Sequence, residues 1–209
     1  LRSEDVDIER LSDEIIKLHN GGQINVVAEF GTLRNSGLRG PDFFLTRHVF
    51  EKALAHLEAR VETVLPCVVT LCKEAGQDMA AGTIFNEYVD FCTRVPARPK
   101  EALKLIEKNP ADFGLALSAT IDAGSRHDWD FFVAETIRLM CHEDVELRTR
   151  STFALHRIAS SGRGAIPQEA VDVLSFRIDK EQHDLALGGA IKAAIALQRA
   201  GVVEVDDAV

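Results

Sequence analysis

The sequence predicts an all-α protein, built as a superhelix (solenoid) of stacked antiparallel helical hairpins, on three observations. Apolar residues recur at intervals of three and four between Gly and Pro residues, which is the pattern of amphipathic helices. Trp and Tyr occur once each while Ala and Leu are frequent, which disfavours strands. The stretch beginning at Asp144 is echoed about 40 residues later, and such a period is typical of stacked helix pairs.

The first 40 residues give the weaker part of this helical pattern. A first helix is expected to end at Gly21-Gly22, because glycine commonly follows a helix C-terminus, and its apolar face is Ile8, Leu11, Ile15 and Leu18. Residues 24–33 favour a second helix, although Gly31 weakens it and residues 24–26 also fit the start of a strand. Residues 35–42 are expected to form a loop.

The later elements are predicted from an apolar ridge and from helix start signals. The ridge runs from Phe50 to Cys72, and Pro66 is expected to kink it or divide it into two helices, since interior proline costs about 3 kcal/mol. Capping residues or prolines predict further helix starts at Thr83, Pro99, Pro110, Asp128, Asp144, Pro167 and Asp184. The Pro110 helix is expected to continue to Gly124. Residues 202–209 are expected to be a tail, and residues 1–209 a single solenoid-like domain.

The echo consists of two amphipathic stretches with five matched positions. Asp144, Val145, Leu147, Ala154 and Leu155 are matched by Asp184, Leu185, Leu187, Ala194 and Ile195. The first copy, Asp144-Val145-Glu146-Leu147-Arg148 followed by Ala154-Leu155, resembles the first helix of a HEAT-like (armadillo-type) repeat. The resemblance covers residues 129–201.

The resemblance implies a fold and specific roles for some of these residues. It implies stacked helical hairpins in which Asp144 and Arg148 link adjacent repeats. The second copy has Gly188 where the family pattern has Arg, a departure that is expected of a terminal unit. We expect the echoed apolar residues Leu147, Leu155, Leu187 and Ile195 to be buried between the repeats.

Charge and cysteine content limit the compartment and the partners. The formal net charge is −9, which repels phosphate backbones and disfavours non-specific nucleic-acid binding. Cys67, Cys72, Cys92 and Cys141 lie in apolar helical contexts without disulfide spacing, which indicates core positions and a reducing, cytoplasmic setting. No apolar run reaches the roughly 18 residues of a membrane span. The first Met is Met79, so we expect the original N-terminus to be missing, through removal of a targeting signal or because the chain is a fragment.

Two basic runs are the candidate binding surfaces. The first comprises Arg94, Arg98, Lys100, Lys104 and Lys108, and the second comprises Arg148, Arg150, Arg157 and Arg163. Each run either forms a solvated helix face balanced by nearby Glu residues or binds an acidic partner or nucleic acid. Trp129 is a candidate anchor if it is exposed and a core residue if it is not. The candidate partner-binding residues are Arg94, Arg98, Lys104, Trp129, Arg148, Arg150 and Arg157.

Catalytic and metal sites are not predicted. His127-Asp128 and His183-Asp184 resemble the dipeptide of HD-type metal-dependent phosphohydrolases, in which an upstream His, here His156, would also bind metal. The required downstream acid is found only in the expected tail, so we interpret Asp128 and Asp184 as helix N-caps. No phosphate-binding glycine loop occurs, and no catalytic residue, cofactor or metal ligand is assigned.

The predicted function is a non-catalytic protein–protein interaction or scaffolding module, part of a larger chain or assembly, with another protein as its partner. The alternative is a nucleic-acid-binding or DNA-repair protein, since alkylation-repair glycosylases use a similar helical stack. Clustering of both basic runs on one concave face would favour that alternative, while the acidic net charge opposes it. An HD-type phosphohydrolase ranks last.

Overall fold

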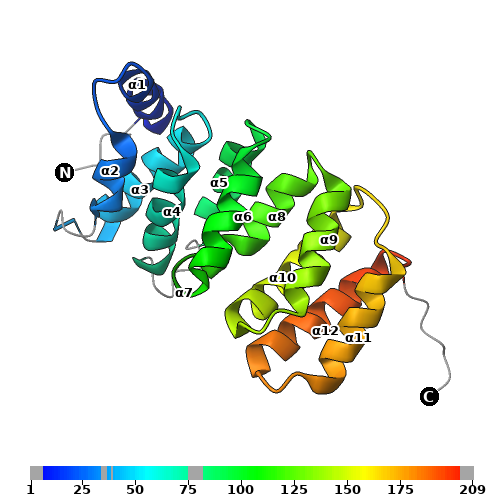
Figure 1. The fold of residues 1–209 in the computed structure, drawn as a ribbon. Helices are drawn as coiled ribbons and strands as arrows, with labels where there is room; N and C mark the ends of the chain where they lie inside the picture. The colour runs from blue at the N-terminus through cyan, green and yellow to red at the C-terminus, as the bar shows by residue number, and fades with distance from the viewer. Residues whose placement is uncertain (1–6, 34–36, 39, 75–81, 203–209) are drawn as a thin grey trace. The chain divides into compact units, whose positions relative to one another are not determined.

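The computed structural model describes residues 7–33, 37–38, 40–74 and 82–202, and every regular element in these ranges is a helix (Figure 1). The all-α prediction is therefore confirmed for the described residues. The chain divides into two compact units, Leu1–Arg98 and Pro99–Val209. The single solenoid domain over residues 1–209 stays a prediction, as does the tail, which lies outside the described residues apart from Val202.

Five α-helices lie in the part of the first unit that the structure describes. They are α1 (Ile8–Asn20), α2 (Val26–Gly31), α3 (Gly40–Leu54), α4 (Val61–Glu74) and α5 (Ile84–Thr93). Helix α3 packs against α1 and α5, and α4 packs against α2 and α5. The second predicted helix is confirmed as α2, which begins because the Asn25 side chain accepts a hydrogen bond from the Ala28 N–H.

Two boundaries in the first unit differ from the prediction. Helix α3 already begins at Gly40, so the expected 35–42 loop is too long at its C-terminal end; residues 34–36 and 39 lie outside the described residues. The apolar ridge divides at residues 55–60 and not at Pro66, which lies inside the continuous helix α4. Proline there removes only the one hydrogen bond to the Glu62 carbonyl, and packing of α4 against α2 and α5 compensates for that loss.

The second unit begins within α6 (Arg98–Lys108) and continues, over the described residues up to 202, through seven further helical elements. They are α7 (Pro110–Phe113), a 3₁₀ turn (Gly114–Ala116), α8 (Leu117–Ser125), α9 (Trp129–Met140), α10 (Val145–Ser161), α11 (Gln168–Lys180) and α12 (Asp184–Arg199). The helix predicted from Pro110 to Gly124 is thus wrong, because the 3₁₀ turn interrupts it. There Gly114 lies so close to the Glu146 side chain that a Cβ would overlap it.

Two predicted N-caps have different outcomes. Asp128 caps α9 by accepting from the Phe131 N–H, as predicted. Asp184 is the first residue of α12 and not its cap; the cap is His183, whose side chain makes no capping hydrogen bond. The negative charge of Asp184 still lies in the first turn of α12, where it interacts favourably with the positive end of the helix dipole.

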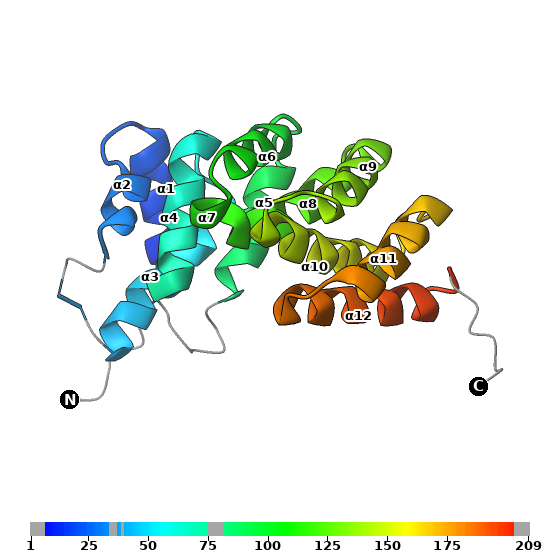
Figure 2. The same cartoon turned by 60° about the horizontal axis from the view of Figure 1, so that its bottom comes forward.

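Alternate helices of the second unit form two layers. Helix α10 packs between α8 and α12, while α9 contacts α8, α10 and α11, and α11 contacts α12. Figures 1 and 2 both show α12 lying alongside α10. Helix α6 lies beside α9, because Lys100 pairs with Asp128 and Glu107 pairs with Arg138. One layer therefore contains α8, α10 and α12, and the other contains α6, α9 and α11.

The expected burial of the echoed residues is only partly correct. Leu147 and Leu155 are fully buried, but Leu187 is half-buried and Ile195 is 42% exposed. The reason is that the buried face of α12 consists mainly of small residues, Ala186, Gly189, Ala190, Ala193 and Ala196, together with Leu197, and does not include Leu187 or Ile195. A Cβ at Gly189 would overlap Thr152 Oγ1, so α10 and α12 approach closely at this small residue, while Ile195 lines the groove beside His156 farther along the helices.

Candidate interaction surface on the second unit

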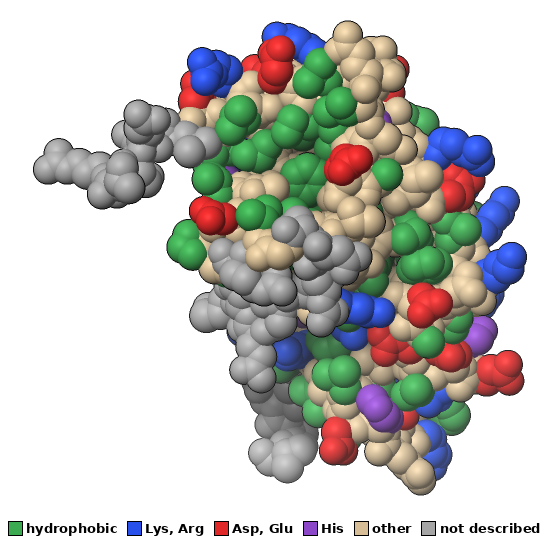
Figure 3. Space-filling model, turned by 90° about the vertical axis from the view of Figure 1, so that its left-hand side faces the viewer, with side chains coloured by type: hydrophobic (Ala, Val, Ile, Leu, Met, Phe, Trp, Pro, Cys, Tyr) green, Lys and Arg blue, Asp and Glu red, His purple; other side chains and the backbone are tan. Residues whose placement is uncertain are grey.

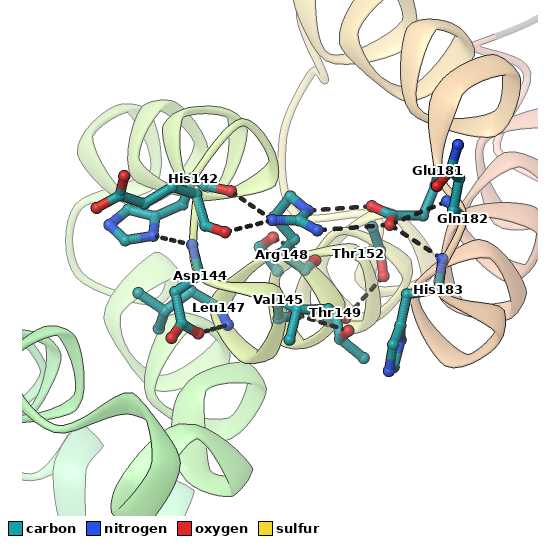
Figure 4. Close-up of polar contacts among 12 residues, drawn as sticks. His142, Asp144, Val145, Leu147, Arg148, Thr149, Thr152, Glu181, Gln182 and His183 are labelled. Atoms are coloured by element: carbon teal, nitrogen blue, oxygen red, sulfur yellow. Dashed lines mark hydrogen bonds and ion pairs between the residues drawn. The ribbon is translucent and has the colours of Figure 1, made fainter.

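Arg148 joins the turn before α10 to the turn before α12. Its Nη1 donates to the carbonyls of His142 at 3.0 Å and Glu143 at 2.7 Å, and its Nε donates to Glu181 Oε2 at 3.0 Å (Figure 4). The bond from Arg148 and the N–H of His183 hold the pKa of Glu181 below its usual range. Arg148 therefore makes an intramolecular link between successive helix pairs.

Asp144, the other residue assigned to that link, makes contacts within its own turn. Its carboxylate accepts the Glu146 N–H at 2.9 Å and the Leu147 N–H at 3.1 Å, and so caps α10. Its own N–H donates to His142 Nδ1 at 3.0 Å. Asp144 thus holds the start of α10 while Arg148 reaches to the neighbouring pair.

Trp129 is half-buried and holds the loop between α10 and α11. Its Nε1 donates to the Ala165 carbonyl at 3.0 Å. Its indole lies so close to Gly164 that a Cβ there would overlap it. The only Trp of the chain is therefore engaged within its own unit.

The first basic run is divided between the two units. Arg98 Nη1 donates to the Phe91 carbonyl at 2.7 Å, and its guanidinium lies 3.7 Å from the Phe91 ring centroid. Arg94 Nη2 lies 3.3 Å from His56 Nε2. Lys104 is exposed on α6, in the layer that contains α9. Within the second unit, the lysines of this run therefore do not share a layer with Arg150 and Arg157 of α10.

A surface of α10 and α12 brings together two of the predicted residues with four that the prediction missed. We define the α10–α12 surface as Arg150, Phe153, Arg157, Lys192, Ile195 and Arg199. Lys192 Nζ lies 5.6 Å from the Phe153 ring centroid, which places the two helices side by side there. The missed residues had a signal in the sequence, because each helix carries a cation, an apolar residue three positions later and a second cation four positions after that.

A cluster of arginines around one carboxylate lies at one edge of this surface. Buried Asp122 of α8 accepts from Arg157 Nε at 2.9 Å and from Arg163 Nη1 at 2.6 Å, and Arg126 Nη2 lies 3.6 Å away. Three guanidinium groups therefore converge on the Asp122 carboxylate. Each of these arginine side chains remains about one-third exposed.

A groove of about 400 Å³ lies between the C-terminal halves of α10 and α12. Its lining combines small apolar residues with polar groups: His156, Ala159, Ser160, Gly162, Ile195, Ala196, Arg199 and Ala200. Arg150, which is near the other end of α10, pairs with Glu146 at 2.8 Å. The surface can therefore offer both an apolar depression and positive charge.

The first unit has a different pocket, of about 460 Å³, beside a buried ion pair. Arg47 Nη2 lies 2.8 Å from Glu51 Oε1, which also accepts from Thr83 Oγ1 at 3.1 Å. Burial raises the pKa of Glu87, which lines the same pocket. The face shown in Figure 3, on the side where α1, α2 and α3 lie, mixes hydrophobic groups with side chains of both charges.

The cysteine predictions have mixed outcomes. Cys67 and Cys92 are buried, and burial raises the pKa of Cys92 to about 12. Cys72 is half-buried, and Cys141 is exposed, so its predicted core position is wrong. The reason is that Cys141 follows the last residue of α9 as its C-cap, where the chain turns toward solvent.

The described residues hold no group of three or more His, Cys, Asp or Glu side chains arranged to bind a metal ion. Asp128, one half of a His-Asp dipeptide, pairs with Lys100 at 2.7 Å, and this bond lowers the pKa of Asp128. None of the described helices is long and apolar enough to cross a membrane.

Comparison with known proteins gives no match to a family model, a curated protein or a solved structure.

Proposed function

We propose that this chain is a non-catalytic protein–protein interaction or scaffolding module whose second unit is a HEAT-like stack of helix pairs. The alternation of α8, α10 and α12 with α9 and α11 supports this proposal. The Arg148–Glu181 pair supports it further, because a link between successive pairs is what the resemblance implies for Arg148. Stacked helix pairs present extended surfaces that suit partner binding. A reducing, cytoplasmic setting belongs to the same proposal.

The observation that carries the binding role is the exposure of large apolar side chains on the last helix pair. Phe176 of α11 is 53% exposed, and Leu185 and Ile191 of α12 are 49% and 46% exposed. Ile178 and Ile195 are exposed on the same two helices. Large apolar side chains exposed on adjoining elements are a common feature of interaction sites, because burying them against a partner is favourable.

The test is affinity capture with the full chain as bait and identification of bound proteins by mass spectrometry. Leu185→Glu/Ile191→Glu should remove specific partners, since a buried charge opposes docking. Gln198→Glu adds a negative charge at an exposed site on the same helix and should retain them. If no protein is captured in a manner that depends on Leu185 and Ile191, the proposal fails.

A nucleic-acid-binding function is the second candidate, and the positive charge of the α10–α12 surface favours it. Phosphate contacts by Arg150, Arg157 and Lys192 would make binding fall steeply with salt, by about 0.9 log units in affinity per contact per log unit of salt. The net charge of −9 opposes it. We expect no measurable binding of short duplex DNA at about physiological ionic strength, as checked by electrophoretic mobility shift. Tight, salt-sensitive binding that Arg157→Glu abolishes would promote this candidate.

A further inference from the structure

We propose that the α10–α12 surface is the docking site for an acidic amphipathic helix of the partner protein, an inference that rests on the proposed protein-binding function. One pattern builds this surface twice. The two copies are Arg150-Phe153-Arg157 in α10 and Lys192-Ile195-Arg199 in α12. Residues at these spacings share one face of a helix, so each helix presents an apolar side chain between two cations.

The two copies lie side by side because α10 and α12 run parallel. Thr152 of α10 lies against Gly189 of α12, and farther along both helices the groove joins His156 to Ile195. Residue numbers therefore increase in the same direction along both helices, and Figure 2 shows α12 lying alongside α10. The pattern extends along both helices as two adjacent rows.

Charge identifies the kind of partner. The cations on or beside the surface are Arg126, Arg150, Arg157, Arg163, Lys192 and Arg199, and the ion pairs described for them use two carboxylates, Asp122 and Glu146. This positive surface belongs to a chain with a formal net charge of −9. Complementary charge steers association and fixes register, so a carboxylate-bearing segment fits here.

The apolar positions favour a helix over a phosphate backbone. The groove of about 400 Å³ beside Ile195 and Ala196 can receive an aliphatic side chain. An amphipathic helix supplies aliphatic anchors at intervals of three and four with carboxylates beside them. Single-stranded nucleic acid instead uses aromatic rings as stacking platforms, and here the half-buried Phe153 ring lies beside Lys192.

The test is fluorescence anisotropy with the full chain and a labelled synthetic helix of 16 residues, the length of α12. The probe carries Leu at i, i+4, i+7 and i+11 with Glu beside them, and a scrambled peptide of equal composition controls for charge alone. Lys192→Glu/Arg199→Glu should weaken binding by at least about tenfold. The matched variant Lys17→Glu/Lys52→Glu makes the same charge change at exposed positions of α1 and α3 and should leave affinity within about twofold.

Several outcomes would overturn the inference. Equal weakening in both double variants, with matching melting temperatures, would indicate non-specific charge attraction. Tighter binding of labelled DNA than of the peptide, lost in Lys192→Glu/Arg199→Glu, would assign the surface to nucleic acid. A gain of about tenfold in peptide affinity in Glu204→Gln/Asp206→Asn/Asp207→Asn would make this chain's own acidic residues the occupant.

One outcome would separate this inference from the proposed function. A partner whose capture depends on Leu185 and Ile191 but is unchanged in Lys192→Glu/Arg199→Glu would preserve the proposed function and overturn this inference alone.

Discussion

At the residue scale, Arg148 combines a charge pair with two carbonyl acceptors, and its loss should be felt in stability. Arg148→Ala removes bonds to Glu181, His142 and Glu143 and leaves the mostly buried Glu181 carboxylate without this partner. We expect a loss of about 1–3 kcal/mol in the free energy of unfolding, measured by urea denaturation. Arg148→Lys should recover only part of this stability, since one ammonium cannot reach both the Glu181 carboxylate and the carbonyls of His142 and Glu143. Equal free energies of unfolding in the native chain, Arg148→Ala and Arg148→Lys would contradict a stabilising role of Arg148.

The same pair predicts a pH dependence. The pKa of Glu181 is lowered in the folded protein, so its contribution to stability is complete above the unfolded value of about 4.3 and is lost as pH falls through the folded pKa. The stability difference between the native chain and Glu181→Gln should therefore be large at neutral pH and shrink below about pH 4. Urea unfolding at a series of pH values measures it. A difference that grows on acidification would contradict the assignment.

Leu155 and Ile195 occupy matched positions of the echo but have different surroundings. Leu155→Ala should cost about 2–5 kcal/mol, because the side chain is fully buried. Ile195→Ala should cost less than about 1 kcal/mol, because the side chain is 42% exposed. Thermal or chemical unfolding of both variants tests the contrast, and similar costs would mean that the two helices bury equivalent faces.

At the scale of the element, two adjacent glycines of α12 should respond oppositely to the same substitution. Gly188 has open space where a Cβ would stand, so Gly188→Leu should stabilise the helix by about 0.5–1 kcal/mol through propensity. Gly189 lies against Thr152, so Gly189→Leu should destabilise by about 1–3 kcal/mol through overpacking. The melting temperatures of the two variants test this contrast. Stabilisation by Gly189→Leu would mean that α10 and α12 lie farther apart than the contact of Gly189 with Thr152 indicates.

The same helices show how far the sequence could predict the fold. Local signals identified most helix positions, because a cap such as Asp128 or Asp144 acts on its own turn. The exposure of Ile195 could not be predicted, because the choice of a face rich in alanine in α12 depends on how α12 packs against α10. The close approach of Gly114, in the 3₁₀ turn, to the Glu146 side chain likewise joins residues that are distant in sequence. Periodicity determines that a face exists, whereas tertiary packing selects which face is buried.

The candidate site was predictable to a similar extent. Arg150 and Arg157 were identified from a run of like charge, and the structure pairs them with Glu146 and buried Asp122. Lys192 was missed because it is isolated in the sequence and gains its basic neighbours only through the packing of α12 on α10. A run of like charges in the sequence indicates a charged face on one element. A surface shared by two helices can be predicted only when it is known which helices are neighbours.

At the scale of the whole molecule, the division into two units predicts where a core substitution will act. Leu155 lies in the second unit, in which α10 contacts α8, α9 and α12. Helical stacks transmit stability through nearest-neighbour interfaces, so Leu155→Ala should raise amide hydrogen exchange in α8 to α12 first. Helices α1 and α2 of the first unit should keep their native exchange rates. Hydrogen–deuterium exchange read by mass spectrometry measures this helix by helix, with Ile195→Ala as the matched control. A uniform rise from α1 to α12 would show that the two units unfold as one cooperative body.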